Sequence, residues 1–170
     1  VQIEILLSRQ LWTIRTFWPR FAMISYFLAW QFLLSFFLKG GNRKVAFTAA
    51  VTSSSSSWNS GNLIFNRIIS NLGNGYNHRT GVFTAPVAGT YVFYVSVNEY
   101  NKLGIGLEIV LNNVGKVRLL GYSDSSNQTG TNMVVLNLQK NDGVCVRHWW
   151  GKGYCTYSDV PLTTFSGFMI

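Results

Sequence analysis

The sequence predicts an all-β domain, a sandwich or jelly roll of about eight to ten short strands. From Val45 onward, short runs rich in β-branched and aromatic residues are separated by turn-forming Gly, Asn, Asp, Ser and Pro, which is typical of strands joined by tight turns. The run Thr90–Asn98 alternates between two faces as a strand does. The turn sequences Asn112–Gly115 and Asp142–Gly143 each separate two further runs and predict hairpins.

The first predicted strands are short. Val45–Val51 is followed by the serine-rich loop Thr52–Ser60, whose side chains offer nothing to bury. The extended pieces Leu63–Ile69 and Tyr76–Asn77 flank Asn71–Gly75, a cluster of turn-forming residues.

The central strand is the most regular. Gly81–Ala85 precedes it and is closed by Pro86. Thr90–Asn98 then carries apolar residues on both of its faces. Because one sheet face packs on the domain core, apolar residues on the second face predict another covering surface, such as a neighbouring subunit.

The last five predicted strands comprise the two pairs that flank the predicted turns and a closing strand. They are Gly106–Leu111, Lys116–Tyr122, Met133–Leu138, Val144–Trp149 and Thr163–Met169.

The segment 1–44 differs from the predicted domain 45–170. Its run Phe21–Leu38 contains no charged residue. This run is barely long enough to span a bilayer as a helix, and it also fits a signal peptide that starts at Met23 and ends near Gly40 and Gly41.

Two interpretations of this segment stay open. In one it is a cleaved signal peptide; in the other it is an uncleaved anchor, with Arg15 and Arg20 holding the N-terminus in the cytosol. Both place the C-terminal domain outside the cell. A buried helix fits less well because a sandwich of strands has no place for it.

The basic charge of the chain is concentrated in the same segment. The net charge is +8, and charged residues make up only 12% of the chain against 48% apolar residues. Six basic residues and one acidic residue lie within residues 1–44. Because the domain itself is only mildly basic, the sequence argues against nucleic-acid binding, which needs a clustered basic face.

A spaced set of residues in the domain carries a family signature. The set is Phe65, Asn71, Tyr76, Phe83, Gly89, Tyr91 and Phe93, followed at the C-terminus by Phe165, Gly167 and Phe168. This spacing resembles the globular domain of complement C1q, in the C1q/tumour necrosis factor-like superfamily, over Val45–Ile170. Val95 stands where the family has a further aromatic residue.

The resemblance implies a ten-stranded jelly-roll sandwich, preceded here by the N-terminal hydrophobic segment, that assembles as a homotrimer. The chain has no collagen repeat of Gly at every third position, so it is similar to the short secreted form without a collagen stalk. The signature residues are assigned to core and interface packing, with Gly89 and Gly167 allowing tight turns or close strand approach.

The sequence offers little for catalysis. His78 and His148 are the only histidines, and no nucleophile elbow, zinc-protease motif or phosphate loop is present. Gly104-Ile105-Gly106 lacks the third glycine and the helix of a dinucleotide site. We therefore expect no enzyme, no metal site and no cofactor, apart from the calcium considered below.

The two cysteines, Cys145 and Cys155, are expected to form a disulfide, because exposed thiols do not persist in an oxidising space. The alternative is two unpaired thiols. Gly151 and Gly153 lie between the two cysteines and would let the chain fold back.

The segment around Trp150 is the candidate ligand-binding region. Arg147, Trp150, Lys152 and Tyr154 combine aromatic plates with cations, which suits stacking on sugar rings and pairing with carboxylate or sulfate. Strand alternation places Trp149 and Trp150 on opposite faces, so at least one is expected in the core or an interface.

The polar loop Ser123–Gly130 is the second candidate. Asn127-Gln128-Thr129 fits the acceptor pattern for N-glycosylation. Asp124 with the amides of Asn127 and Gln128 could hold calcium, although one carboxylate is too few without symmetry-related copies.

The sequence and the resemblance together predict a secreted pattern-recognition protein of innate immunity. It would act as a lectin-like, multivalent homotrimer on carbohydrate or other microbial and cell-surface ligands. The alternative is a secreted or membrane-anchored trimeric ligand for a cell-surface receptor, similar to cytokines of the tumour necrosis factor type or to cerebellins.

Overall fold

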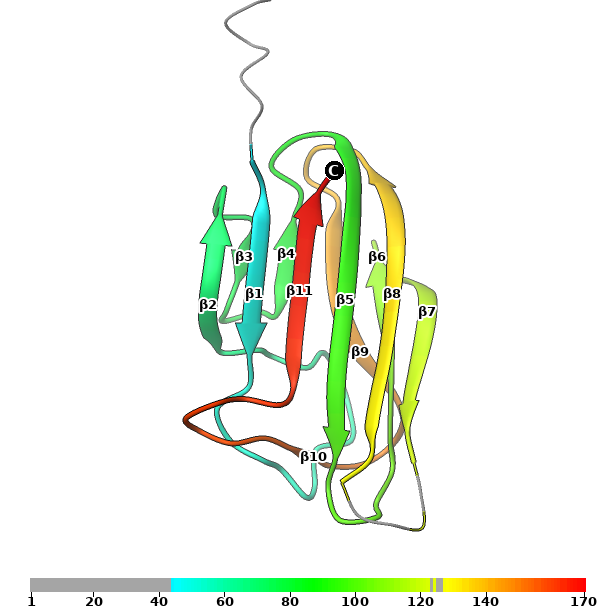
Figure 1. The fold of residues 1–170 in the computed structure, drawn as a ribbon. Coiled ribbons are helices and arrows are strands. Elements are labelled where there is room, and N and C mark those ends of the chain that lie inside the picture. The colour runs from blue at the N-terminus through cyan, green and yellow to red at the C-terminus, as the bar shows by residue number, and fades with distance from the viewer. Residues whose placement is uncertain (1–43, 123, 125–126) are drawn as a thin grey trace, which may run out of the picture. The chain divides into compact units, whose positions relative to one another are not determined.

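The computed structural model describes residues 44–122, 124 and 127–170. The described part consists of strands, turns and loops arranged in two antiparallel sheets (Figure 1). This confirms the predicted all-β jelly-roll class. The predicted hydrophobic run 21–38 lies outside the described residues. Within the described residues, no helix is long and apolar enough to cross a membrane.

One sheet has six strands and contains both the first and the last strand of the domain. Its members are β1 (Ala46–Ala50), β2 (Arg67–Leu72), β5 (Gly89–Glu99), β8 (Thr129–Leu138), β10 (Tyr154–Cys155) and β11 (Thr164–Met169). The neighbours run β5-β11-β1-β2, with β8 and the short β10 also pairing with β5. The last strand therefore lies between the first strand and the central one (Figure 1).

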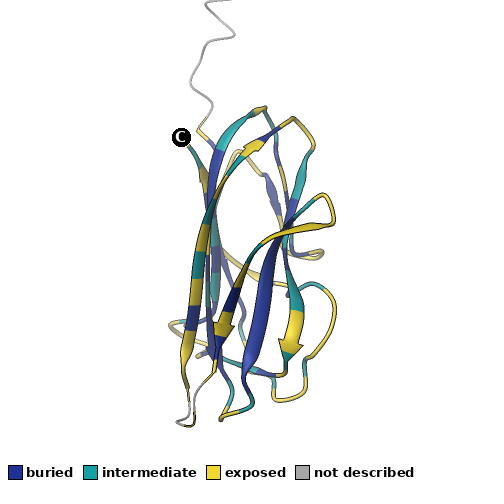
Figure 2. Cartoon of the chain, turned by 90° about the vertical axis from the view of Figure 1, so that its right-hand side faces the viewer, coloured by how far each residue is buried: buried dark blue, intermediate teal, exposed yellow. Residues whose placement is uncertain are grey.

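The other sheet has five strands in the order β3-β4-β9-β6-β7. They are β3 (Tyr76–Asn77), β4 (Val82–Thr84), β6 (Ile105–Leu111), β7 (Val114–Gly121) and β9 (Gly143–Gly151). Strands β6 and β9 supply the inner face with Leu107, Ile109, Val144 and Val146, all buried. Figure 2 shows buried stretches in strands of both sheets.

Aromatic rings fill the space between the sheets. Phe47 of β1 stacks on Tyr76 and Phe83, at centroid distances of 4.8 and 5.1 Å, and contacts Phe165 edge-on. The six buried aromatic residues of the family signature are Phe65, Tyr76, Phe83, Tyr91, Phe93 and Phe165. A Cβ at Gly167 would lie only 2.6–2.8 Å from atoms of the Phe47 and Phe93 rings, so the rings need glycine there. Phe168, by contrast, points outward.

Asn71 shapes the turn between β2 and β3. Its side chain exchanges two hydrogen bonds with the backbone of Tyr76, at 2.9 and 3.1 Å, and the turn between them contains Asn74 and Gly73 at positive φ. The predicted strand Leu63–Ile69 is wrong in its bounds. Leu63 and Phe65 are buried anchors of a loop, and pairing with β1 begins at Arg67 and continues through Leu72.

Of the two predicted hairpins, only the one between β6 and β7 forms, because β8 and β9 are consecutive strands that lie in different sheets and do not pair with each other. Between β6 and β7, Asn112 and Asn113 both have positive φ, as a two-residue hairpin turn requires. Between β8 and β9, Asn141 takes the positive φ that was assigned to Asp142-Gly143. The Asp142 carboxylate instead accepts hydrogen bonds from the Gln139 N–H and the Asn112 amide.

The predicted disulfide is not formed, because Cys145 and Cys155 are both free thiols in different sheets. Cys145 lies near the start of β9, and the strand continues to Gly151, about 20 Å away at the usual rise per residue. Cys155 then pairs with Asn98 at the end of β5. The four residues that follow Gly151 are too few to bring the chain back, so the glycines between the cysteines do not close a loop.

Candidate ligand-binding face

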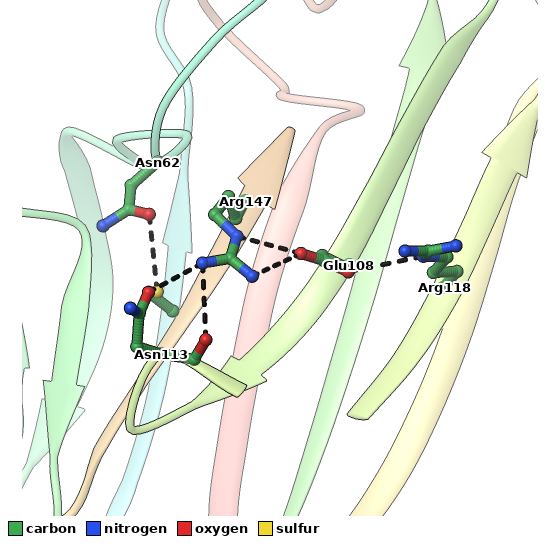
Figure 3. A network of polar contacts seen from close by, with 6 residues as sticks. Asn62, Glu108, Asn113, Arg118 and Arg147 are labelled. Carbon is green, nitrogen blue, oxygen red and sulfur yellow. Dashed lines mark hydrogen bonds and ion pairs between the residues drawn. The ribbon is translucent and has the colours of Figure 1, made fainter. Parts of the chain in front are cut away.

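A row of charged side chains crosses the outer face of the five-stranded sheet. Glu108 in β6 lies directly between Arg118 of β7 and Arg147 of β9, which are its partners in the strand register. Arg147 donates to Glu108 Oε1 through Nε and Nη2, at 2.9 and 2.6 Å, and Arg118 Nε donates to Oε2 at 3.3 Å (Figure 3). One carboxylate therefore holds two guanidinium groups.

The row is anchored at its β9 end by asparagines. Arg147 Nη1 also donates to Asn113 Oδ1 at 2.7 Å, in the hairpin between β6 and β7. The neighbouring Cys145 thiol donates to Asn62 Oδ1 at 3.5 Å (Figure 3). Burial raises the pKa of the Cys145 thiol, which favours its protonated form.

The Glu108 carboxylate stays ionised in this setting. Burial alone would raise its pKa, but the hydrogen bonds and charges of Arg147 and Arg118 outweigh that effect, and the pKa is lowered from its usual value. Its side chain is 9% exposed, that of Arg147 31% and that of Arg118 63%. Arg147 is thus held firmly, whereas Arg118 reaches into solvent.

An open depression of about 500 Å³ lies over this row. It is lined by Glu108, Gly115, Lys116, Val117, Arg118 and Arg147. A Cβ at Gly115 would lie 2.6 Å from Glu108 Oε2, so the absence of a side chain lets the carboxylate reach its position. Among the described residues, Lys116 forms no ion pair and the Nη groups of Arg118 have no acceptor. Three cations and one carboxylate leave an excess of positive charge.

Trp149 and Trp150 lie on the same side of the sheet, which corrects the expectation that alternation separates them. The register between β6 and β9 shifts at this point: Gly106 pairs with Trp150, whereas Leu107 pairs with His148. Trp149 is the extra residue of a β-bulge, and a bulge interrupts alternation. Both indoles are partly exposed, at 37% and 41%, and their ring centroids are 6.4 Å apart.

Two glycines make room for these rings. A Cβ at Gly106 would lie 2.7 Å from the Trp149 ring, and one at Gly104 would lie 2.6 Å from the Trp150 ring. Tyr122, also exposed, contacts Trp150 edge-on at 5.7 Å. We call Trp149, Trp150 and Tyr122 the aromatic shelf.

The aromatic shelf is continuous with the charged depression. The Arg118 guanidinium carbon lies 4.8 Å from the centre of the Trp149 ring, within the range of a cation–π contact. The same Arg118 lines the depression.

The four ligand-binding residues predicted from the sequence do not form one cluster. Arg147 lines the depression and Trp150 belongs to the aromatic shelf. Lys152 is exposed in the loop after β9, where its backbone N–H donates to Gly104 O. Tyr154 lies in β10, which belongs to the six-stranded sheet. Its half-buried ring contacts Trp58 edge-on at a centroid distance of 5.7 Å.

Sequence reasoning missed Glu108, Lys116, Arg118 and Tyr122. They come from β6, β7 and the residue after β7, so only strand pairing brings them to Arg147 and Trp150. The hairpin turn was the available signal. With Asn112 and Asn113 as its two turn residues, counting back along both strands leads to the neighbourhood of Glu108 and Arg118, but the additional bulge at Ile109 and Val110 shifts that count.

The second candidate loop is only partly described. Asn127 is exposed with positive φ, and its carbonyl accepts a hydrogen bond from the buried Asn98 amide. Asp124 is exposed as well. Within the described residues, no group of three or more His, Cys, Asp or Glu could hold a metal ion. Glycosylation of Asn127 and calcium binding stay predictions.

The outer face of the six-stranded sheet has the opposite character. Its outward positions form rows, one being Met133, Tyr94, Ser166 and Thr48, and the next Val135, Val92, Phe168 and Ala46. Met133, Tyr94, Val135 and Phe168 are exposed. None of the outward positions of β1, β5, β8 and β11, all of which are described, carries a charge. We call this the apolar face.

Comparison with known proteins identifies the family of the domain. The C1q domain family matches residues 46–170. Complement C1q tumor necrosis factor-related protein 3 is 31% identical over 129 residues in Mus musculus and 32% identical over 133 residues in Homo sapiens. Each match covers 75% of this chain and 51% of the relative, so the chain spans about half the length of these curated relatives.

Solved structures share the fold. The globular domain of zebrafish complement 1qA aligns with a TM-score of 0.62 at 22% identity, covering 75% of this chain and 98% of that one. Murine APRIL aligns with a TM-score of 0.60 at 10% identity, covering 75% and 99%. The Eiger TNF of S. frugiperda aligns at 0.59 and 13% identity, covering 76% and 94%. At these identities the likeness concerns the fold alone.

Proposed function

The chain belongs to the C1q domain family, and from this premise we propose that it is a secreted, non-enzymatic recognition protein that acts as a homotrimer. Each subunit would bind carbohydrate or another repeated surface structure on microbes or cells. Three weak sites on one rigid body then give an avidity well above that of a single contact.

The apolar face is the observation that carries the proposal. A monomeric protein rarely exposes a large apolar patch, and such patches commonly mark protein–protein contacts. Here Met133, Tyr94, Val135 and Phe168 are exposed on adjacent strands, with small or hydroxyl side chains between them. Copies of this uncharged surface can pack against one another without removing charged side chains from water.

The five-stranded sheet is suited to the ligand rather than to assembly. Self-association through its outer face would bring Lys116 and Arg118 of neighbouring copies together, and like charges repel. If the apolar face is covered in a trimer, the charged depression and the aromatic shelf stay open to solvent. The proposal thus assigns assembly and recognition to different sheets.

A second candidate is a trimeric ligand for a cell-surface receptor. It is favoured by the identity of 31–32% with the C1q tumor necrosis factor-related proteins. The two candidates share the trimer and differ in what the exposed faces contact. A receptor would form a protein interface of roughly 800 Å² on each side, whereas sugars would make shallow contacts.

The test has two parts, both made with the full chain. Sedimentation should give a trimer at micromolar concentration; a monomer there would contradict the assembly. The trimer should then bind members of a panel of microbial and animal polysaccharides, measured with and without calcium. Capture of a single membrane protein together with an entirely negative panel would favour the receptor ligand.

A further inference from the structure

We propose that the outer face of the five-stranded sheet is a binding site for an acidic polysaccharide, with sulfate or carboxylate groups in the depression and sugar rings on the aromatic shelf. This inference rests on the proposed recognition function and names the ligand class and the site. Its central residues are Lys116, Arg118, Trp149 and Trp150.

The first argument is the free hydrogen-bonding capacity of the depression. Glu108 uses its two oxygens to hold Arg147 and Arg118 in place. Arg118 lines the depression and engages Glu108 through Nε alone, so its two Nη groups have no acceptor among the described residues. A guanidinium presented in this way matches the planar oxygens of a carboxylate or sulfate.

The second argument is the excess of cations. Lys116, Arg118 and Arg147 line the depression with Glu108 as the single carboxylate. Glu108 is already neutralised by its hydrogen-bonded pair with Arg147, and its lowered pKa keeps that pairing intact at neutral pH. The charge available to a ligand is therefore positive, and a neutral sugar would not neutralise it.

The third argument is the shape of the aromatic shelf. The bulge brings Trp149 to the same side as Trp150, and Gly104 and Gly106 let both indoles lie close to the sheet. Exposed, partly packed indoles offer flat apolar surfaces at little cost in conformational entropy. Such a surface fits the apolar face of a sugar ring, next to the cations that would hold its acidic substituent.

The arrangement favours a polysaccharide over an acidic protein. Protein interfaces have an apolar centre and place charged residues at the rim. Here the charges line the depression itself, and the aromatic residues lie at one end of it. A chain that alternates sugar rings with anionic groups would use both parts at once.

The experiment compares dextran sulfate with uncharged dextran of the same length, using the full-length trimer. The basic segment 1–44 is present in every sample, so differences between variants report on the domain. The test variant is the double substitution Lys116→Gln and Arg118→Gln. The matched control is Arg79→Gln with Lys140→Gln, which removes two exposed cations elsewhere on the domain.

We expect the wild type to bind dextran sulfate in preference to dextran. The test variant should lose roughly tenfold or more in affinity, because hydrogen bonds to charged groups are lost. The control variant should lose less than about twofold. Added salt should weaken the wild-type interaction more than that of the test variant.

A second variant tests the aromatic shelf. Trp149→Ala should reduce the affinity for dextran sulfate several-fold, as loss of an exposed stacking surface does. Because Trp149 is partly exposed, the trimer and its unfolding transition should persist, and both are measured as checks of folding.

Three outcomes overturn the inference. Equal losses of affinity for dextran sulfate in the test and control variants would show that the depression is not the binding site. Equal affinity for dextran and dextran sulfate would remove the acidic class, while carbohydrate recognition by the trimer stands. Tighter binding of polyglutamate than of dextran sulfate, abolished by the same double substitution, would assign the face to an acidic protein. Failure to form a trimer concerns the proposed function alone.

Discussion

The outer faces of the two sheets are built from equally regular strands and differ almost completely in chemistry. The apolar face presents Met133, Tyr94, Val135 and Phe168 without a charge among them. The opposite face presents Glu108 between two arginines, with two indoles beside them. Since both faces cover the same core, the fold does not impose this difference. On the proposed function, it reflects what each face contacts in the trimer.

The largest expected effect is on assembly. Tyr94→Lys places a charge at the middle of the apolar face in every subunit, and burying an unpaired charge is strongly unfavourable. We expect the trimer to dissociate at micromolar concentration, measured by sedimentation. Arg118→Glu, an equally drastic change on the opposite face, should leave the trimer intact. Dissociation by both variants, or by neither, would break the division between the faces.

The next effect is on stability, through the carboxylate of the charged face. Glu108→Ala leaves Arg147 half-buried without its partner, and we expect a loss of about 2–3 kcal/mol in the free energy of unfolding. Arg118 is mostly exposed, so Arg118→Ala should cost less than about 1 kcal/mol. Denaturant unfolding of the two variants measures both values. Equal losses in the two variants would show that Glu108 contributes no more to stability than an exposed surface ion pair does.

A pH titration sharpens the same result. The pKa of Glu108 is lowered in the folded state, so its contribution is fully present above the ordinary carboxyl value of 4.5 and is lost as the pH falls through the lowered value. The stability difference between wild type and Glu108→Gln should therefore be constant from neutral pH down to about 4.5 and shrink below it. A difference that shrinks already near pH 6 would point to another titrating group.

A smaller effect is expected at the aromatic shelf. Gly106→Ala would bring a methyl group within 2.7 Å of the Trp149 ring, which lies at the surface and can move outward. We expect a change in tryptophan fluorescence with less than about 1 kcal/mol of destabilisation. Gly167→Ala meets the buried Phe47 and Phe93 rings instead and should cost about 1–3 kcal/mol. Similar costs at both positions would contradict this contrast.

The smallest effect concerns Asn127. If this exposed residue carries a glycan, Asn127→Gln should abolish a shift in electrophoretic mobility upon glycosidase treatment of protein from a secreting eukaryotic cell. Stability and assembly should change little, because the hydrogen bond that residue 127 provides to Asn98 comes from its backbone carbonyl. An unchanged mobility pattern in the wild type after treatment would show that the site is unused.

The sequence predicted the scaffold better than the surface. Alternation in β5 identifies its buried residues correctly, because that pattern lies within one strand, and the family signature from Phe65 to Phe93 identifies further core aromatics through the resemblance. The disulfide prediction was wrong because the separation of Cys145 and Cys155 depends on how far β9 continues. Lys116 and Arg118 were missed because their neighbours come from other strands, in a register shifted by a bulge.

The bulge at Trp149 lets the outer side of β9 change while its buried side stays the same, which matters for protein engineering and for evolution of the sequence. Leu107 pairs with His148 and Ile109 with Val146. Leu107, Ile109 and Val146 are all buried, so the extra residue shifts the register without moving these side chains out of the core. The outer side has nevertheless gained a whole indole. A strand that absorbs one residue without disturbing its core side can vary its recognition surface by insertion and deletion as well as by substitution. Libraries built on this scaffold should therefore vary the length of β9 at this point together with its side chains.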